Sequence, residues 1–219
     1  MYADDHNDEK PMYEANVAEY YFSTFKDGKD MDDMMRWAEK WEKWATTGDA
    51  ADANADYRDS MLIPYYGESL DQLDFVWLGI NTNPEMQAIG NDYWVQNGGK
   101  LLEELPVTNA QVVNTWQRTV SETPDGTAGY VVYSDCKYGE GVTGEQQYDA
   151  WFAFAQAAKK LGDVAGRKMI WPTMGITPGW DYDYVQAVYT SSITDYGKNW
   201  TNFWGADNDI PEYLSLIHI

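Results

Sequence analysis

Apolar and aromatic positions in the first half of the chain follow strand-like and helix-like spacings in turn. Strands are predicted where aromatic and β-branched residues cluster or alternate, at 17–25, 57–66, 75–81 and 112–120. After the first strand, four large apolar residues recur at helical spacing before Gly48 ends the helix: Met34, Trp37, Trp41 and Trp44. Pro84 opens a second helix over 85–104. The predicted order is β-α-β-β-α-β.

The second half of the chain repeats this order. Strands are predicted at 130–136, 169–174 and 184–190, and helices at 143–161 and 194–204. A final strand, the counterpart of 112–120, is not found in the pattern. The second unit is therefore predicted to lack its last strand.

Three pairs of short motifs recur in the same order along the two halves. Segments 61–67 and 169–175 read MLIPYYG and MIWPTMG, with Met, Pro and Gly at identical places. Each is preceded by a Lys-x-Gly motif and followed by an Asp-aromatic-Val motif, which begin at Lys26, Lys137, Asp74 and Asp183. The paired motifs lie about 110 residues apart, a period that indicates two copies of one structural unit.

This repeat divides the chain into segments. They are a polar N-terminal segment (1–14), a first ferredoxin-like repeat (15–121), a turn-rich linker (122–128), a truncated second repeat (129–213) and a tail (214–219). The tail matches the translation of a common sequencing adapter, so the chain is interpreted as a metagenomic fragment that stops near Tyr213. The charged start resembles the stretch after a signal-peptide cleavage site. A soluble protein is expected, and export to the periplasm or the exterior is left open.

Composition restricts the partners. Lys and Arg number 15 against 36 Asp and Glu, a formal net charge of −21, which repels phosphate backbones and anionic lipid headgroups. Neither nucleic acid nor a membrane surface is therefore an expected partner. Hydrophobic residues make up 44% and aromatic residues 16% of the chain, enough for a packed core. Cys136 is the single cysteine, so no internal disulfide can form.

A β-α-β-β-α-β unit is the ferredoxin-like split fold, an antiparallel sheet with both helices on one face. In the strand at 75–81, Phe75 and Trp77 alternate with Val76 and Leu78, so both faces are apolar and the helix-free face needs a cover. Two tandem units can cover one another. The chain therefore resembles the dimeric α/β-barrel superfamily, as a fused pseudo-dimer of the α+β class that can still form higher oligomers.

The resemblance carries expectations about function. Members of this superfamily include cofactor-independent monooxygenases, muconolactone-isomerase-like proteins and haem enzymes such as chlorite dismutase. It implies a ligand site either between the sheet and its helices or within the barrel. Because one fold serves many functions, the resemblance alone does not select among them.

Polar residues among apolar strand neighbours are the candidate catalytic groups. Glu19 and Arg118 lie on the predicted first and fourth strands, which are neighbours in this fold, and a carboxylate beside a guanidinium can be tuned for proton transfer. The alternative for this pair is a structural salt bridge. Asn81 can hydrogen-bond a substrate oxygen, or it can form the turn before Pro84.

Aromatic residues on and next to the predicted strands are candidate walls of a ligand pocket. They are Tyr65, Trp77, Trp116, Trp171 and Tyr184. Aromatic walls suit apolar rings or sugars. Core packing explains the same residues, and the helical stripe of Trp37, Trp41 and Trp44 is interpreted as core.

Scarcity of histidine argues against haem and zinc. His6 lies in the N-terminal segment and His218 in the tail, which leaves tyrosine or Cys136 as axial haem ligands. Segment 52–56 begins like a calcium loop, but Tyr57 stands where such loops need glycine and Ile63 where they need glutamate. A polar surface loop is predicted there, and no cofactor or metal is expected.

Three functions follow from these observations. The first is binding of a small apolar or aromatic molecule in a barrel or cleft pocket, without haem. The second is a cofactor-independent monooxygenase- or isomerase-like enzyme acting on a small organic substrate. The third is a structural or interaction protein without a ligand. The missing histidine, the usual near-neutral proton carrier, favours the binder over the enzyme, and whether the chain is an enzyme stays undecided.

Overall fold

The computed structural model describes residues 13–68 and 70–205, so the predicted tail and most of the N-terminal segment lie outside the described residues. The strands are β1 (Ala15–Phe25), β2 (Arg58–Leu62), β3 (Phe75–Asn81), β4 (Val107–Ser121), β5 (Tyr130–Cys136), β6 (Gly166–Met174) and β7 (Tyr184–Thr190). The helices are α1 (Met31–Ala45), α2 (Asp49–Ala53), α3 (Pro84–Asn97), α4 (Gly99–Glu104), α5 (Gly144–Lys160) and α6 (Ile193–Gly205), with a 3-10 turn at Leu70–Gln72.

The predicted order of elements is confirmed, with two differences. The helix expected over 85–104 is two helices that meet at Gly98, where the Trp94 ring folds back and leaves no room for a Cβ atom. The short helix α2 forms where a polar loop was predicted, because Ala50 and Ala53 are buried there. The spacing of apolar residues along the chain could not predict the packing of Trp94 on Gly98 or the burial of the two alanines.

Local capping explains where the long helices begin. The side chain of Asp30 accepts a hydrogen bond from the Asp33 backbone N–H at the start of α1. Asn83 does the same for α3, whose first residue is a proline. Thr143 and Gln146 form a reciprocal capping box at α5. These polar side chains satisfy N–H groups that the helices cannot satisfy internally.

All seven strands in the described part of the chain form one antiparallel sheet, in the order β2-β3-β1-β4-β6-β7-β5. The first four are the ferredoxin-like order of the first repeat. Pairing of β4 with β6 joins this repeat to the second one. The prediction of tandem ferredoxin-like repeats is therefore confirmed, with seven of the eight strands that two complete repeats would contain.

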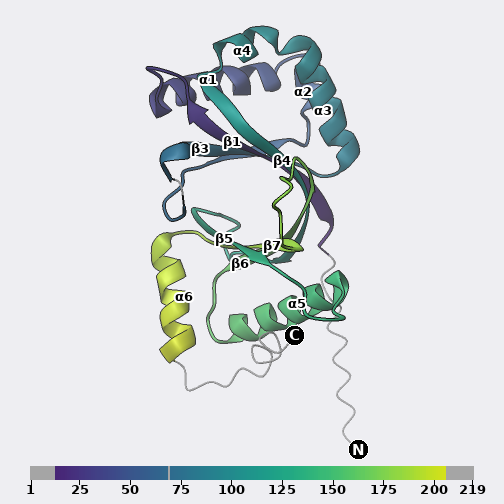
Figure 1. Ribbon diagram of the computed structural model, residues 1–219, viewed down its shortest axis with the longest axis vertical. Coiled ribbons are helices and arrows are strands. Elements are labelled where there is room, and N and C mark those ends of the chain that lie inside the picture. The colour runs from purple at the N-terminus through teal and green to yellow at the C-terminus, as the bar shows by residue number, and fades with distance from the viewer. Residues whose placement is uncertain (1–12, 69, 206–219) are drawn as a thin grey trace, which may run out of the picture.

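The two repeats shield each other's helix-free sheet faces. Helices α1 to α4 cover one outer side of the curled sheet, and α5 and α6 cover the opposite outer side (Figure 1). The inner faces meet in a core of buried residues from both repeats: Ala18, Tyr20, Val76, Leu78, Ile170 and Ala187. This shared core confirms the predicted pseudo-dimeric barrel.

The ends of the sheet are β2 and β5, and the described residues supply no strand for their outer sides. The barrel is thus not closed by the part of the chain that the structure describes. In the same part, none of the helices combines the length and the hydropathy needed to cross a lipid bilayer.

Candidate functional site

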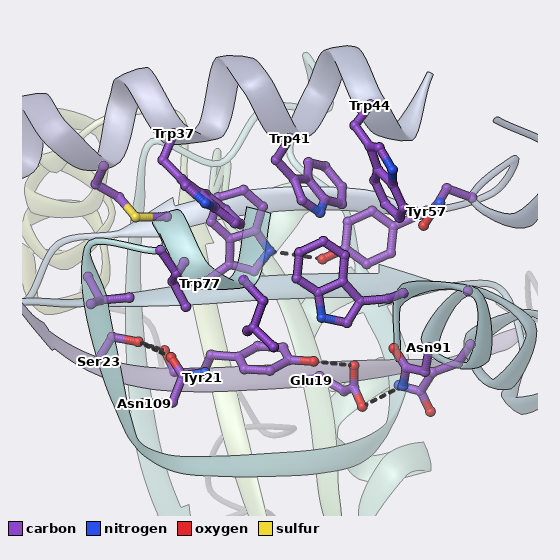
Figure 2. Close-up of a pocket in the computed structure, with 18 of the residues that line it drawn as sticks. Glu19, Tyr21, Ser23, Trp37, Trp41, Trp44, Tyr57, Trp77, Asn91 and Asn109 are labelled. Carbon is purple, nitrogen blue, oxygen red and sulfur yellow. Dashed lines mark hydrogen bonds between the residues drawn. The ribbon is translucent and has the colours of Figure 1, made fainter. Parts of the chain in front are cut away.

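A cavity of about 110 Å³ lies in the first repeat, between the outer face of its sheet and helices α1, α3 and α4. Figure 2 shows the α1 tryptophans pointing from the helix toward the sheet, where Glu19 and Tyr21 form the floor. We call this site the aromatic pocket, after the aromatic residues that line it: Tyr21, Trp37, Trp41, Trp44, Tyr57, Trp77 and Trp94.

Helix α1 supplies one wall of the aromatic pocket. Trp37, Trp41 and Trp44 follow one another at spacings of four and three, so they share one face of the helix. Trp37 is 7% exposed and donates from Nε1 to the carbonyl of Leu101 at 2.8 Å. Trp41 and Trp44 are only half-buried. All three rings of the stripe therefore line the aromatic pocket, and Trp37 is the one that is also buried in the core.

Trp77 and Tyr57 form the opposite wall. The indole Nε1 of Trp77 donates to the Tyr57 hydroxyl at 2.8 Å, and the rings of Trp37 and Trp41 meet Trp77 edge to face at 6.0 and 5.4 Å. Burial raises the pKa of Tyr57, so its phenol keeps its proton. Tyr57 lies flat over β3 because Gly79 has no side chain there. This wall is consequently neutral and rigid.

The polar floor centres on Glu19. Its carboxylate accepts hydrogen bonds from the Tyr21 hydroxyl at 2.9 Å and from Asn91 Nδ2 at 3.0 Å. Burial, and then the charge of Glu19, raise the pKa of Tyr21, which therefore stays a donor. Two fixed donors hold the carboxylate in one orientation, with lone pairs left for a further partner.

Gln87 on α3 adds a buried donor. The residue is 6% exposed, and its Oε1 accepts a hydrogen bond from Asn114 Nδ2 at 2.8 Å. Its Nε2 has no hydrogen-bond partner among the described residues. A buried amide N–H without an acceptor costs about 1–3 kcal/mol, so such groups call for an explanation. Gln87 is also one of the residues that line the aromatic pocket.

A second hollow of about 390 Å³ lies on the other side of Trp41. It shares Trp41, Tyr57 and Trp77 with the aromatic pocket, and it adds three acidic residues: Glu39, Glu42 and Asp59. We call it the acidic groove. Asp59 is exposed when all of its atoms are counted, but its carboxyl group is partly desolvated. This desolvation, and then the charge of Glu42, raise the pKa of Asp59 above the ordinary 3.8.

We predict that Asp59→Asn raises the melting temperature at neutral pH. A raised pKa in the folded state means that ionised Asp59 disfavours folding above that pKa. The penalty disappears as the pH falls below 3.8, because both states are then protonated. Thermal unfolding at about pH 7 and about pH 3 should show the gain only at the higher pH. Glu103→Gln, an exposed change on α4, is the control, and an equal gain at both pH values would contradict the prediction.

Three predicted site residues line the aromatic pocket: Glu19, Asn81 and Trp77. Asn81 is 4% exposed and donates from Nδ2 to Asp56 Oδ1 at 3.2 Å. Asp56 also accepts from the backbone and hydroxyl of Thr82. Partial burial alone would raise the pKa of Asp56, but these hydrogen bonds outweigh it and lower the pKa. Asn81 thus serves the turn before α3 as well as the pocket wall.

The predicted pair of Glu19 and Arg118 is not formed. The strands β1 and β4 are neighbours as expected, but their register places Glu19 opposite Asn114 and Arg118 opposite Ala15. The Arg118 guanidinium donates to Glu145 at 3.0 Å and lies 3.7 Å from the Tyr148 ring centroid, both on α5 of the second repeat. The pairing is corrected for this reason, and a catalytic role for any of these groups stays a prediction.

The predicted aromatic walls do not meet in one pocket. Trp77 lines the aromatic pocket, whereas Trp171 and Tyr184 pack with Trp151 in the helix-covered core of the second repeat. Trp116 is 40% exposed on β4, and Tyr65 is 66% exposed after β2. The two repeats turn their outer faces in opposite directions, so strand residues at equivalent places cannot converge.

Sequence reasoning missed much of the aromatic pocket. Tyr21 carried a usable signal, because it stands two residues after Glu19 and alternation puts both on one face of β1. No such signal was present for the other lining residues, because whether they come together depends on how α3 docks on the sheet. These residues are Tyr57, Gln87, Asn91 and Trp94.

Solved structures with the same fold include a putative chlorite dismutase, with a TM-score of 0.51 and 12% identity over 88% of this chain and 87% of that one. A variant of the chlorite dismutase of Candidatus Nitrospira defluvii gives a TM-score of 0.49 at 11% identity, covering 89% of this chain and 84% of that one. No protein-family model and no curated protein matches the chain by sequence. The first likeness shows the fold alone, the tandem α/β barrel of the chlorite dismutases.

Some proteins with this fold are haem enzymes, and haem iron takes histidine, cysteine thiolate, methionine or tyrosine as ligands. The described residues contain no histidine. Burial raises the pKa of the Cys136 thiol, which disfavours a thiolate. On the helix-covered face of the second repeat, Tyr138 accepts a hydrogen bond from Trp171 Nε1 at 2.6 Å and stacks on Tyr184. Neither a histidine nor a readily ionised thiol is therefore offered to haem iron by the described residues. They also contain no group of three potential metal ligands, the segment 52–56 included.

Proposed function

We propose that this chain binds a small, largely aromatic molecule that carries a hydrogen-bond acceptor, and that it does so in the aromatic pocket. The observation that carries the proposal is Gln87, which lines the aromatic cavity and whose buried Nε2 has no acceptor among the residues that the structure describes. The cavity of about 110 Å³ limits the ligand to about one ring, since an apolar cavity of about 150 Å³ holds a benzene molecule.

The pocket's chemistry supports a binder more than an enzyme. Its neutral aromatic walls offer stacking and edge contacts, worth about 0.5–1.5 kcal/mol for each aromatic pair beyond the burial of area. Glu19 and Gln87 offer one acceptor and one donor that would orient the ring. The guanidinium on which the enzyme hypothesis depended is engaged with Glu145 in the other repeat. Binding is therefore the function we put forward.

Two probes of matched shape test the proposal: acetophenone, which has a carbonyl acceptor, and ethylbenzene, which has none. We expect both to quench tryptophan fluorescence, and acetophenone to bind more tightly because its carbonyl accepts from Gln87 Nε2. Gln87→Met should lower the affinity for acetophenone about five- to tenfold, which is the effect of losing one hydrogen bond. The affinity for ethylbenzene should not change.

The control for this test is Gln96→Met on the same helix, at an exposed position outside the aromatic pocket. It should change neither affinity. The proposal fails if neither probe binds, or if chemical-shift changes in the presence of acetophenone map away from Trp41, Trp77 and Gln87.

A further inference from the structure

The two hollows carry charge of one sign. Glu19 lines the aromatic pocket, and Glu39, Glu42 and Asp59 line the acidic groove. Among the described residues that line either hollow there is no lysine and no arginine. Carboxylates that share a hollow repel one another: burial raises the pKa of Asp59, and the negative charge of Glu42 raises it further. A cation placed between them would relieve this repulsion.

No cationic side chain of the described residues packs on the aromatic rings between the two hollows. Rings of α5 in the second repeat do have one: Arg118 of β4 lies 3.7 Å from the ring centroid of Tyr148, and Arg167 of β6 lies 5.2 Å from that of Phe154. No such contact reaches Trp41 or Trp77 among the described residues. Indole is the side chain whose face attracts cations most strongly. The first repeat therefore presents indole rings beside carboxylates, without an arginine of the kind that packs on the rings of α5.

We propose that the ligand of this site is an organic cation: the aromatic molecule also carries an ammonium group, whose charge lies against Trp41, Tyr57 and Trp77. The inference rests on the proposed function and names the class of its ligand. Glu42 and Asp59 balance the charge from the acidic groove, and Glu19 balances it from the floor of the aromatic pocket. The net charge of −21 draws cations toward the protein from solution.

An organic cation fits the site better than a metal ion does. Hard metal ions need several oxygen ligands converging on one point, and no group of three potential ligands is present in the described residues. The shared wall of Trp41, Tyr57 and Trp77 offers ring faces and edges instead. Alkylammonium groups are bound by rings and by diffuse negative charge, which is what these two hollows combine.

Choline and its neutral isostere 3,3-dimethylbutan-1-ol test the inference, with acetophenone as the uncharged aromatic reference. Titration calorimetry at low salt should show choline binding about tenfold more tightly than the isostere, because only choline has a charge for the rings and carboxylates to attract. Raising the salt concentration should lower the affinity for choline and leave the affinity for the isostere unchanged, since mobile ions screen exposed charges.

The double variant Glu42→Gln/Asp59→Asn should lower choline affinity about tenfold and leave acetophenone affinity unchanged. Glu103→Gln is the matched control, because it removes an exposed carboxylate that lines neither hollow. Trp41→Leu should weaken both choline and acetophenone. Circular dichroism of each variant confirms that it is folded.

Three results would contradict the inference. Equal binding of choline and 3,3-dimethylbutan-1-ol overturns the cation inference, and the proposed function then stands if acetophenone binds. An unchanged choline affinity in the double variant also overturns it. Absence of binding by choline and acetophenone alike overturns the inference and the proposed function together.

Discussion

Gly79→Ala is expected to abolish ligand binding in the aromatic pocket while the chain still folds. A Cβ atom on Gly79 would overlap the Tyr57 phenol ring, which is fixed by its hydrogen bond from Trp77 and its contact with Trp41. The ring must shift, and both hollows lose the wall that they share. We expect at least a tenfold loss of acetophenone or choline affinity, and a stability loss of about 1–3 kcal/mol from overpacking.

Calorimetry and thermal unfolding of Gly79→Ala measure the two effects separately. Gly99→Ala on α4 is the control, because no atom lies within 4 Å of the added Cβ, and its affinity and stability should not fall. Adding Tyr57→Ala to Gly79→Ala removes the overlap and should restore part of the stability but none of the binding. Unchanged affinity in Gly79→Ala would show that Tyr57 does not form the site.

Asp163→Ala is expected to be the most destabilising single change that we consider. Arg167 is 5% exposed, and its guanidinium donates to both carboxylate oxygens of Asp163, at 3.1 and 2.8 Å. Removing Asp163 leaves this charge buried without its counter-ion, which typically costs about 3–5 kcal/mol. For a chain of this size, each kcal/mol lowers the melting temperature by about 2–4 °C, so a fall of roughly 10 °C is expected.

A double variant separates loss of the charge pair from loss of packing. Asp163→Ala/Arg167→Met removes both charges and should recover most of the lost melting temperature, because apolar side chains of similar volume replace such pairs at little cost. Glu104→Ala, which breaks the exposed Lys40–Glu104 pair, should change stability much less, since solvent screens those charges. Equal effects of Asp163→Ala and Glu104→Ala would contradict the argument.

The fold was predictable because its signals are local or periodic. Alternation in β3 and the helical spacing of the α1 tryptophans each depend on neighbouring residues, and both predictions are confirmed. The repeat of the Met-x-x-Pro-x-x-Gly motif then indicated two units. The apolar character of both faces of β3 indicated that the units shield one another, as the shared core of Tyr20 and Ile170 confirms.

The candidate site was predictable only in part. Glu19, Asn81 and Trp77 were singled out as polar or aromatic residues on strands, and they do line one pocket. Arg118 was not excluded, because strand neighbourhood does not give register. Gln87 could not be predicted, since a glutamine on a helix is common. What distinguishes it is tertiary: Asn114 donates to its Oε1, and its buried Nε2 has no acceptor among the described residues.

The order of elements, their duplication and the need for the two repeats to cover each other can be deduced from the amino-acid sequence, because these features follow from periodicity within each segment. Only the folded chain shows that an aromatic pocket opens in the first repeat, while Tyr138, Trp171 and Tyr184 fill the equivalent layer of the second. The physical reason is long-range: register between β1 and β4 and the docking of α3 set which side chains meet.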